Sequence, residues 1–308
     1  MRVAAIDCGT NSVRLLVTDV DAETGRLYDL HREMRIVRLG EGVDRTGLLA
    51  ESALARTRLA LTDYAAVIRG LGAERVRLVA TSATRDAGNR DVFVSMVSET
   101  LGVEPEVVTG TEEARLSFTG AAGALYGFEG PVLVADIGGG STELVLGGGR
   151  YQRLRAYSMD IGSVRMTERH LHDDPPTPAQ VEAAVADVRT ALSQAAADVP
   201  LDTGAVLVGV AGTVTTLAAI GLGMTEYDSG RIHGSRLSAT DVHEITERLL
   251  KLDHAGRSAI SVIHPGRVDV ITGGALILRT IVEQSGVREL IVSEHDILDG
   301  IALSLLES

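Results

Sequence analysis

One short pattern occurs twice in this sequence, and it constrains the fold more than any other feature. Each copy consists of an apolar run, an Asp-x-Gly turn rich in small polar side chains, and a second apolar run; the copies span residues 3–17 and 132–146. The runs have the length and the aliphatic content that are typical of buried strands, so each copy predicts two strands that fold back around the turn. A unit repeated at this distance predicts two similar α/β lobes, with one copy in each lobe.

The length of the chain fits this division, because 308 residues is about twice the size of a common domain of roughly 150 residues. We expect an N-terminal lobe over residues 1–124 and a C-terminal lobe over residues 125–308, each with a mixed sheet flanked by helices, around a central cleft. Apolar residues near the end of the chain recur at helical spacing, which predicts a C-terminal helix at about 296–308.

Local signals place further elements around the repeat. In the first half we expect helices over 51–70 and 89–101 and strands over 75–80 and 106–108. Thr111 is the expected N-cap of the next helix, with Glu112 and Glu113 in its first turn. In the second half, Thr177 and Gln180 have the spacing of a capping box, which predicts a helix start there.

The charge balance limits the partners of the chain. Asp and Glu number 42 against 29 Lys and Arg, a net charge of −13, so we expect no nucleic-acid partner, since diffuse binding to nucleic acid needs a basic face. No apolar run approaches the roughly 18 residues of a membrane span, so we expect no membrane partner.

Asp7 interrupts the N-terminus before the apolar core of an export signal could form. With one cysteine, no intramolecular disulfide can form, and we expect a cytoplasmic location.

The two turns have the composition of phosphate-binding loops. Glycine-rich turns let backbone N–H groups approach a phosphoryl group closely, and hydroxyl side chains add further donors. Carboxylates beside such a turn can bind Mg²⁺ or another divalent cation, which bridges phosphate oxygens, and Asp136 and Glu143 are the expected metal ligands. The expected phosphate-binding residues of the turns are Gly9, Thr10, Asn11 and Ser12 in the first copy and Gly138, Gly139, Gly140, Ser141 and Thr142 in the second.

Eight blocks of sequence, in the same order, resemble the exopolyphosphatase / guanosine pentaphosphate phosphohydrolase family, within the actin / sugar kinase / heat-shock ATPase superfamily. The blocks are DCGTNSVRLLV (7–17), TSATRDAGN (81–89), GTEEARLSF (110–118), DIGGGSTELV (136–145), DIGSVRMTE (160–168), GVAGTVTTL (209–217), IHPGRVDVI (263–271) and SEHDILDGIAL (293–303). The resemblance covers nearly the whole chain and implies two actin-like (ribonuclease H-like) lobes. It matches the short members of the family, and in relatives the C-terminal helix returns to the N-terminal lobe.

The resemblance also implies roles for individual residues. It assigns the catalytic base to Glu113, and a helix N-terminus favours the charged form of that carboxylate. It places Arg85 on the phosphate chain, a task that suits a guanidinium. Gly212 and Thr213 lie where related kinases build a nucleoside pocket, and here we expect them either to bind phosphate or simply to begin a helix. Weaker candidates for a basic track along a polymeric substrate are Arg165, Arg231, His233 and Arg267, although a surface or structural role is the favoured interpretation of each.

These expectations lead to one main hypothesis of function and several alternatives. The main one is a Mg²⁺-assisted exopolyphosphatase that releases orthophosphate from the end of inorganic polyphosphate, with in-line attack by a water that Glu113 activates. The alternative substrate is guanosine pentaphosphate, which the motifs cannot separate from polyphosphate. A non-catalytic sensor of polyphosphate or guanosine tetra- and pentaphosphate would not need Glu113, and a kinase would need a nucleoside pocket that the sequence does not show. Assembly as a homodimer is left open.

Overall fold

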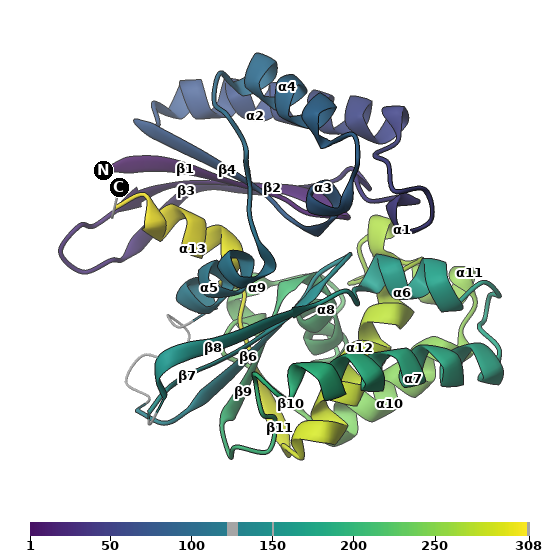
Figure 1. Cartoon of the computed structure of the whole chain (residues 1–308). Helices are drawn as coiled ribbons and strands as arrows, with labels where there is room; N and C mark the ends of the chain where they lie inside the picture. The colour runs from purple at the N-terminus through teal and green to yellow at the C-terminus, as the bar shows by residue number, and fades with distance from the viewer. Residues whose placement is uncertain (122–128, 150, 307–308) are drawn as a thin grey trace. The chain divides into compact units, whose positions relative to one another are not determined.

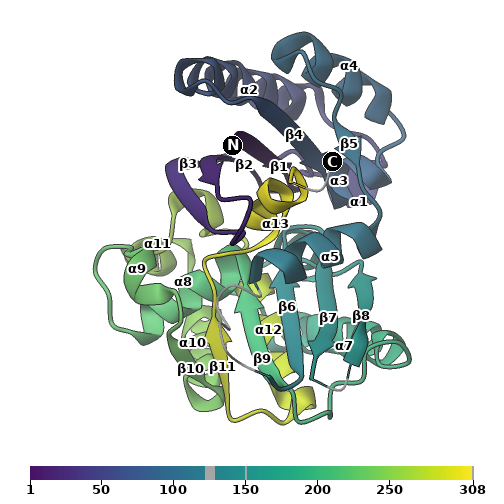
Figure 2. The same ribbon diagram turned by 90° about the vertical axis from the view of Figure 1, so that its left-hand side faces the viewer.

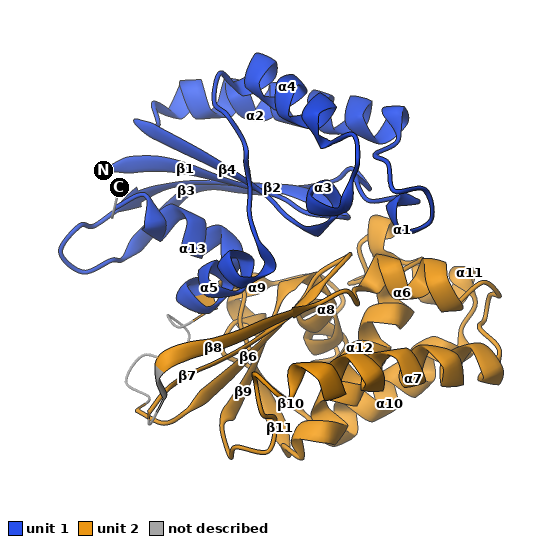
Figure 3. Cartoon of the chain, viewed as in Figure 1, with its two compact units in different colours: residues 1–120, 296–308 blue, residues 121–295 orange. Residues whose placement is uncertain are grey.

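The computed structural model describes residues 1–121, 129–149 and 151–306, and the chain divides into two compact units (Figures 1 and 3). Unit 1 comprises Met1–Gly120 and Asp296–Ser308, and unit 2 comprises Ala121–His295. The domain boundary expected at 124/125 lies outside the described residues. Unit 1 is therefore discontinuous in sequence, because the C-terminal segment belongs to it.

The sheet of unit 1 is mixed and has the strand order β3-β2-β1-β4-β5. β1 pairs antiparallel with β2, which pairs antiparallel with β3, while β1, β4 and β5 run parallel. The strands are β1 (Arg2–Cys8), β2 (Ser12–Val20), β3 (Leu27–Ile36), β4 (Arg75–Ala80) and β5 (Glu106–Val107).

Helices cover both faces of this sheet. Because successive residues of a strand point to opposite faces, Ala4 and Ile6 of β1 contribute to one apolar cluster and Val3 and Ala5 to another. Helices α2 and α4 pack on the first face and α13 packs on the second (Figures 1 and 2). The helices of unit 1 are α1 (Val43–Thr46), α2 (Glu51–Leu71), α3 (Ser82–Asp86), α4 (Arg90–Leu101), α5 (Gly110–Ala121) and α13 (Ile297–Ser304).

The start of α5 differs from the sequence expectation. The helix begins at Gly110, and the hydroxyl oxygen of Thr109 accepts a 3.2 Å hydrogen bond from the backbone N–H of Glu112. This is the bond of an N-cap residue, so Thr109 has that role and the expectation for Thr111 was wrong. Glu112 and Glu113 lie in the first turn, as expected.

The sheet of unit 2 repeats the order of unit 1. Its strands run β10-β11-β9-β6-β7-β8, so the segment from β8 to β11 has the same order and directions as β3-β2-β1-β4-β5, and β10 adds an antiparallel edge strand. The prediction of two similar lobes with mixed sheets is confirmed. The strands are β6 (Val132–Ile137), β7 (Thr142–Gly148), β8 (Tyr151–Met159), β9 (Val206–Val210), β10 (Arg236–Ser238) and β11 (Glu289–Val292).

The core of unit 2 lies between this sheet and its helices. Leu133 and Ala135 of β6 join one large apolar cluster with residues of α7, α10 and α12. The capping box of Thr177 and Gln180 is present at the start of α7, as predicted. The helices are α6 (Ser163–His170), α7 (Pro178–Ala195), α8 (Ala211–Gly221), α9 (Ser229–Ile232), α10 (Ala239–Lys251), α11 (His254–Ser258) and α12 (Ile271–Ser285), with a 3-10 turn at Pro265–Arg267. In the described part of the chain, no helix combines the length and the apolar character that a membrane crossing requires.

Candidate active site

The two Asp-x-Gly turns have the same backbone geometry. The N–H of Gly9 donates a 3.0 Å hydrogen bond to the carbonyl of Ser12, and the N–H of Gly138 donates a 3.0 Å bond to the carbonyl of Ser141. A β-carbon on Gly138 would lie 3.0 Å from the Ser141 carbonyl oxygen, so a side chain there would require a shift of the turn. The repeat seen in the sequence is therefore a repeat of conformation.

The glycine turn of unit 2 directs its carbonyl groups towards α6. Backbone N–H groups at the start of α6 donate to the carbonyls of Gly138 and Gly139, and Nε of Arg165 donates a 2.7 Å bond to the carbonyl of Gly140. Because the C=O and N–H of one peptide point in opposite directions, the N–H groups of Gly139, Gly140 and Ser141 point away from α6. Arg165, a weaker candidate for the substrate track, thus makes a structural contact with the turn.

Two hydroxyl groups of the turns already bond to protein. Thr10 Oγ1 lies 2.9 Å from Ser82 Oγ, and both side chains are buried. Thr142 Oγ1 donates a 2.7 Å hydrogen bond to the carbonyl of Ile161 and is fully buried. These two threonines stabilise the turns, and the backbone N–H groups remain the better candidates for phosphate donors.

The carboxylates next to the turns have different cross-strand neighbours. In unit 2, Asp136 pairs in register with Glu143, so two buried carboxylates lie opposite each other on adjacent strands. Glu143 Oε1 accepts a 2.7 Å hydrogen bond from Ser158 Oγ. In unit 1, the matching partner of Asp7 is Arg14. Only the turn of unit 2 therefore carries a pair of facing carboxylates, which is the donor set that a divalent cation prefers.

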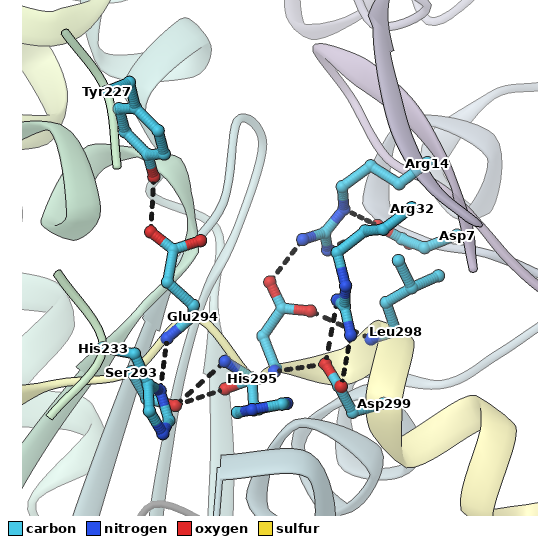
Figure 4. Close-up of polar contacts among 11 residues, drawn as sticks. Asp7, Arg14, Arg32, Tyr227, His233, Ser293, Glu294, His295, Leu298 and Asp299 are labelled. Carbon is cyan, nitrogen blue, oxygen red and sulfur yellow. Dashed lines mark hydrogen bonds and ion pairs between the residues drawn. The ribbon is translucent and has the colours of Figure 1, made fainter. Parts of the chain in front are cut away.

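Arg14 neutralises Asp7 and connects it to the C-terminal helix (Figure 4). Its Nη2 and Nε lie 2.7 and 3.0 Å from Asp7 Oδ2, and Nη1 bonds to the carboxylate of Asp296. Burial raises the pKa of Asp7 above its ordinary value, against the opposing effect of Arg14. Asp296 also caps α13 by accepting the N–H of Leu298, and Arg32 binds Asp299 in the same helix (Figure 4).

Glu113 forms an ion pair with Arg85. Arg85 Nη1 donates a 2.8 Å hydrogen bond to Glu113 Oε2 and a 3.2 Å bond to the carbonyl of Val108. The Glu113 side chain is 9% exposed and that of Arg85 is 23% exposed. The structure therefore joins in one contact the two residues to which the family resemblance assigned the roles of base and phosphate binding. Glu112 is half-buried and lies outside this pair.

The turn that opens α8 packs against an arginine. A β-carbon on Gly212 would lie 2.3 Å from Arg267 Cζ, so the guanidinium contacts the backbone of this turn directly. A β-carbon on Gly274 of α12 would lie 2.4 Å from Thr213 Oγ1, so Thr213 packs against that helix. Ala211, which precedes Gly212, has φ = 68°. The structure thus brings Gly212, Thr213 and Arg267 together.

The two remaining candidates of the basic track lie in α9 and at its C-terminal end. Arg231 is exposed on α9. His233 Nδ1 accepts a 3.2 Å hydrogen bond from the N–H of Glu294, and its ring packs edge-on against His295 with centroids 4.6 Å apart (Figure 4). Sequence reasoning missed Arg14 and Asp296, although the Asp-x-x-Asp spacing at 296–299 is a capping-box signal.

Two mixed sheets that share the same order over five strands, each with an Asp-x-Gly turn, define an actin-like α/β protein. The chain belongs to the Ppx/GppA phosphatase family, whose model matches residues 16–308, and this confirms the resemblance seen in the sequence.

Individual relatives cover the chain almost completely. It is 53% identical over 315 aligned positions to Exopolyphosphatase 2 of Mycobacterium tuberculosis, covering 99% of this chain and 98% of that protein. A crystal structure described as an exopolyphosphatase-like protein superposes with a TM-score of 0.94 at 42% identity, covering 100% of this chain and 99% of the other. A guanosine-5'-triphosphate,3'-diphosphate pyrophosphatase of Photobacterium profundum is 32% identical, covering 89% of this chain and 57% of its own length.

Proposed function

We propose that this protein is an exopolyphosphatase that hydrolyses the terminal phosphoanhydride bond of inorganic polyphosphate and releases orthophosphate. The observation that carries the proposal is the buried Glu113 carboxylate, which Arg85 orients at the first turn of α5. The 53% identity to a protein named exopolyphosphatase, over almost the full length of both chains, supports polyphosphate as the substrate.

In this proposal Glu113 is the general base. A carboxylate has about four lone-pair sites, so Glu113 can accept a proton from water while it also accepts the hydrogen bond from Arg85. Hydrolysis of a phosphoanhydride needs a water in line with the scissile bond and a group that accepts its proton. Arg85 holds the carboxylate in one orientation, and its guanidinium has further donors for a phosphate oxygen.

The turns supply the phosphate donors of the proposal. The N–H groups of Gly139, Gly140 and Ser141 all leave the same side of the unit 2 turn, opposite to α6, and the fixed backbone needs no rearrangement to bind an anion. Gly9–Ser12 gives unit 1 a turn of the same conformation. Donors fixed in advance stabilise the charge that develops on phosphate oxygens during transfer.

We assign a Mg²⁺ site to Asp136 and Glu143. The described residues contain no group of three or more His, Cys, Asp or Glu side chains that could bind a metal, but Mg²⁺ commonly uses one or two carboxylates with water and substrate oxygens as its other ligands. Two buried carboxylates in direct register, one of them oriented by Ser158, fit that demand. When bound, the metal neutralises charge on the phosphate oxygens. The expected cytoplasmic location remains part of the proposal.

The second candidate substrate is guanosine pentaphosphate, which is supported by the similarity to the pyrophosphatase of Photobacterium profundum. The test is release of orthophosphate from polyphosphate, guanosine pentaphosphate and ATP, each with Mg²⁺ and with EDTA. We expect the highest kcat/KM on polyphosphate and no release in EDTA. Release of orthophosphate from guanosine pentaphosphate alone would show that this compound, and not polyphosphate, is the substrate. Binding of these compounds without release of orthophosphate would show that the protein is a sensor.

A further inference from the structure

Two residues other than glycine have a left-handed backbone among the described residues, and both lie at the proposed phosphate-binding turns. Arg38 has φ = 50° and Ala211 has φ = 68°, whereas the other described residues with positive φ are glycines. Ala211 directly precedes Gly212 at the start of α8, and Arg38 contacts the turn of unit 1. A β-carbon is unfavourable in this conformation, and such residues concentrate at functional sites.

The backbone of Arg38 is fixed from the side of the turn. The N–H groups of Val37 and Arg38 donate to the same carbonyl oxygen of Asn11, at 3.0 and 2.9 Å, and the N–H of Gly40 donates a 2.8 Å bond to the carbonyl of Thr10. A β-carbon on Gly40 would lie 2.3 Å from Cγ2 of Thr10, so the segment 37–40 packs tightly against the turn. The conformation of Arg38 is thus coupled to the conformation of Thr10 and Asn11.

Arg56 of α2 fixes the same segment from its other side. Its Nε donates a 2.8 Å hydrogen bond to the carbonyl of Val37, and its Nη2 lies 3.0 Å from the carboxylate of Glu41. Bonds from both sides determine the backbone at residue 38, which explains how an unfavourable conformation persists. They do not explain why the residue is an arginine, since glycine would make the same backbone bonds with less strain.

We propose that Arg38 is a substrate-binding residue whose guanidinium binds a phosphate group of the polyphosphate chain at the unit 1 turn. The inference rests on the proposed function. Arg38 is half-buried, it directly follows a residue bonded to the turn, and a guanidinium has five N–H donors, so it can bind a phosphate oxygen together with protein groups. The backbone N–H of Arg38 bonds to the carbonyl of Asn11, so residue 38 lies next to the turn, and glycine at this position could supply no cation there.

Arg38→Gly separates this role from a structural one. The substitution keeps the backbone N–H that bonds Asn11, removes the strain and removes the guanidinium. If Arg38 only shapes the segment, folded Arg38→Gly should bind and hydrolyse polyphosphate as well as the wild type does. If Arg38 binds phosphate, the folded variant should bind polyphosphate poorly.

The experiment measures KM and kcat on polyphosphate, the dissociation constant for polyphosphate in EDTA, and the thermal midpoint. We expect Arg38→Gly to raise KM and the dissociation constant about tenfold or more, with kcat changed less. Arg38→Lys, which keeps the charge, should lie between Arg38→Gly and the wild type. Arg58→Ala removes an exposed arginine of α2 and should leave both constants unchanged.

Each outcome decides a separate claim. Unchanged KM and dissociation constant in Arg38→Gly, with an active wild type, overturn the role of Arg38 and leave the proposed function intact. If Arg38→Gly is unstable, Arg38→Asn, which also tolerates positive φ, replaces it in the same comparison. A wild type that neither binds nor hydrolyses polyphosphate overturns the proposed function and this inference with it.

Discussion

Arg85 and Glu113 form a 2.8 Å ion pair that links the segment after β4 to the first turn of α5. Arg85 lies in α3, the short helix that directly follows β4, and Glu113 lies in the first turn of α5, so their positions depend on where β4 ends and where α5 begins. The capping bond of Thr109 sets the second of these points. The geometry of the proposed base is therefore sensitive to changes that leave Glu113 itself unaltered.

Replacing Glu113 with Gln should lower kcat on polyphosphate by roughly 10²- to 10⁴-fold, the usual contribution of a general base, with little change in KM. The amide keeps the size of the side chain and an oxygen that can accept the bond from Arg85, but it cannot accept a proton from water. Steady-state kinetics measures the effect. Glu112→Gln is the matched control in the adjacent position and should retain kcat; equal losses in both variants would contradict the assignment.

Asp136→Asn should raise the Mg²⁺ concentration that gives half-maximal activity by at least about tenfold. The substitution removes one of two facing carboxylates, and with it a negative charge that favours a divalent cation. Ser158→Ala, which removes the hydrogen bond to Glu143, should cause a smaller increase in the same direction. Activity is titrated against Mg²⁺, with the exposed Asp160→Asn as the control. An unchanged titration in Asp136→Asn would place the metal elsewhere.

Arg14→Met should lower the free energy of unfolding by about 3 kcal/mol at pH 7, because it leaves the buried carboxylates of Asp7 and Asp296 without their shared cation. The measurement is denaturant unfolding. Arg2→Met removes a more exposed arginine that pairs with Asp19, and should lower the free energy of unfolding far less than Arg14→Met does.

The decrease in the free energy of unfolding that Arg14→Met causes should also depend on pH. Burial raises the pKa of Asp7 in the folded state above the value of 3.8 for a free side chain, and removal of Arg14 raises it further. The folded state then binds more protons than the unfolded state, so stability falls as pH rises and recovers as pH is lowered towards about 4. The difference from the wild type should therefore shrink between pH 7 and pH 5. If the difference in the free energy of unfolding between the variant and the wild type is the same at pH 7 and pH 5, then lost packing, and not lost charge pairing, destabilises Arg14→Met.

Gly300→Ala should destabilise the protein by about 1–3 kcal/mol, as overpacking commonly does. Its β-carbon would lie 1.9 Å from the carbonyl oxygen of Leu116, and the backbone of α5 would have to move. Glycine to alanine within a helix normally stabilises by up to about 1 kcal/mol, so the expected sign is reversed. Gly70→Ala in α2, where a β-carbon meets nothing within 4 Å, is the control and should be neutral or stabilising in denaturant unfolding. Stabilisation by Gly300→Ala would refute the close helix contact.

Local patterns account for the elements that the sequence predicted correctly. The apolar runs around Asp7 and Asp136 predict both hairpins, because the period of a strand and the composition of a tight turn are properties of neighbouring residues. β3 was not predicted from the sequence. It is an edge strand with charged and half-exposed residues, so it lacks the apolar pattern on which the prediction depends.

The N-cap of α5 shows that local sequence patterns predict a helix without determining the residue at which it begins. Thr109 and Thr111 both have a suitable side chain and both precede Glu113. The choice depends on which hydroxyl reaches the N–H of a residue three positions later, and that is decided by where the chain leaves β5. Sequence alone offers two candidates, and the path of the backbone selects one.

The sequence by itself determined the duplicated lobes, the residue types of both turns and the membership of the phosphatase family. Tertiary structure decided which of these residues meet: Arg85 with Glu113, Arg14 with Asp296, and residue 38 with Asn11. The physical reason is that hydrophobic periodicity and turn chemistry act over a few residues, whereas these contacts join segments whose proximity depends on the packing of the whole unit. The acid beside the first turn is thus neutralised by an arginine, and the acid beside the second faces another acid suited to a metal ion.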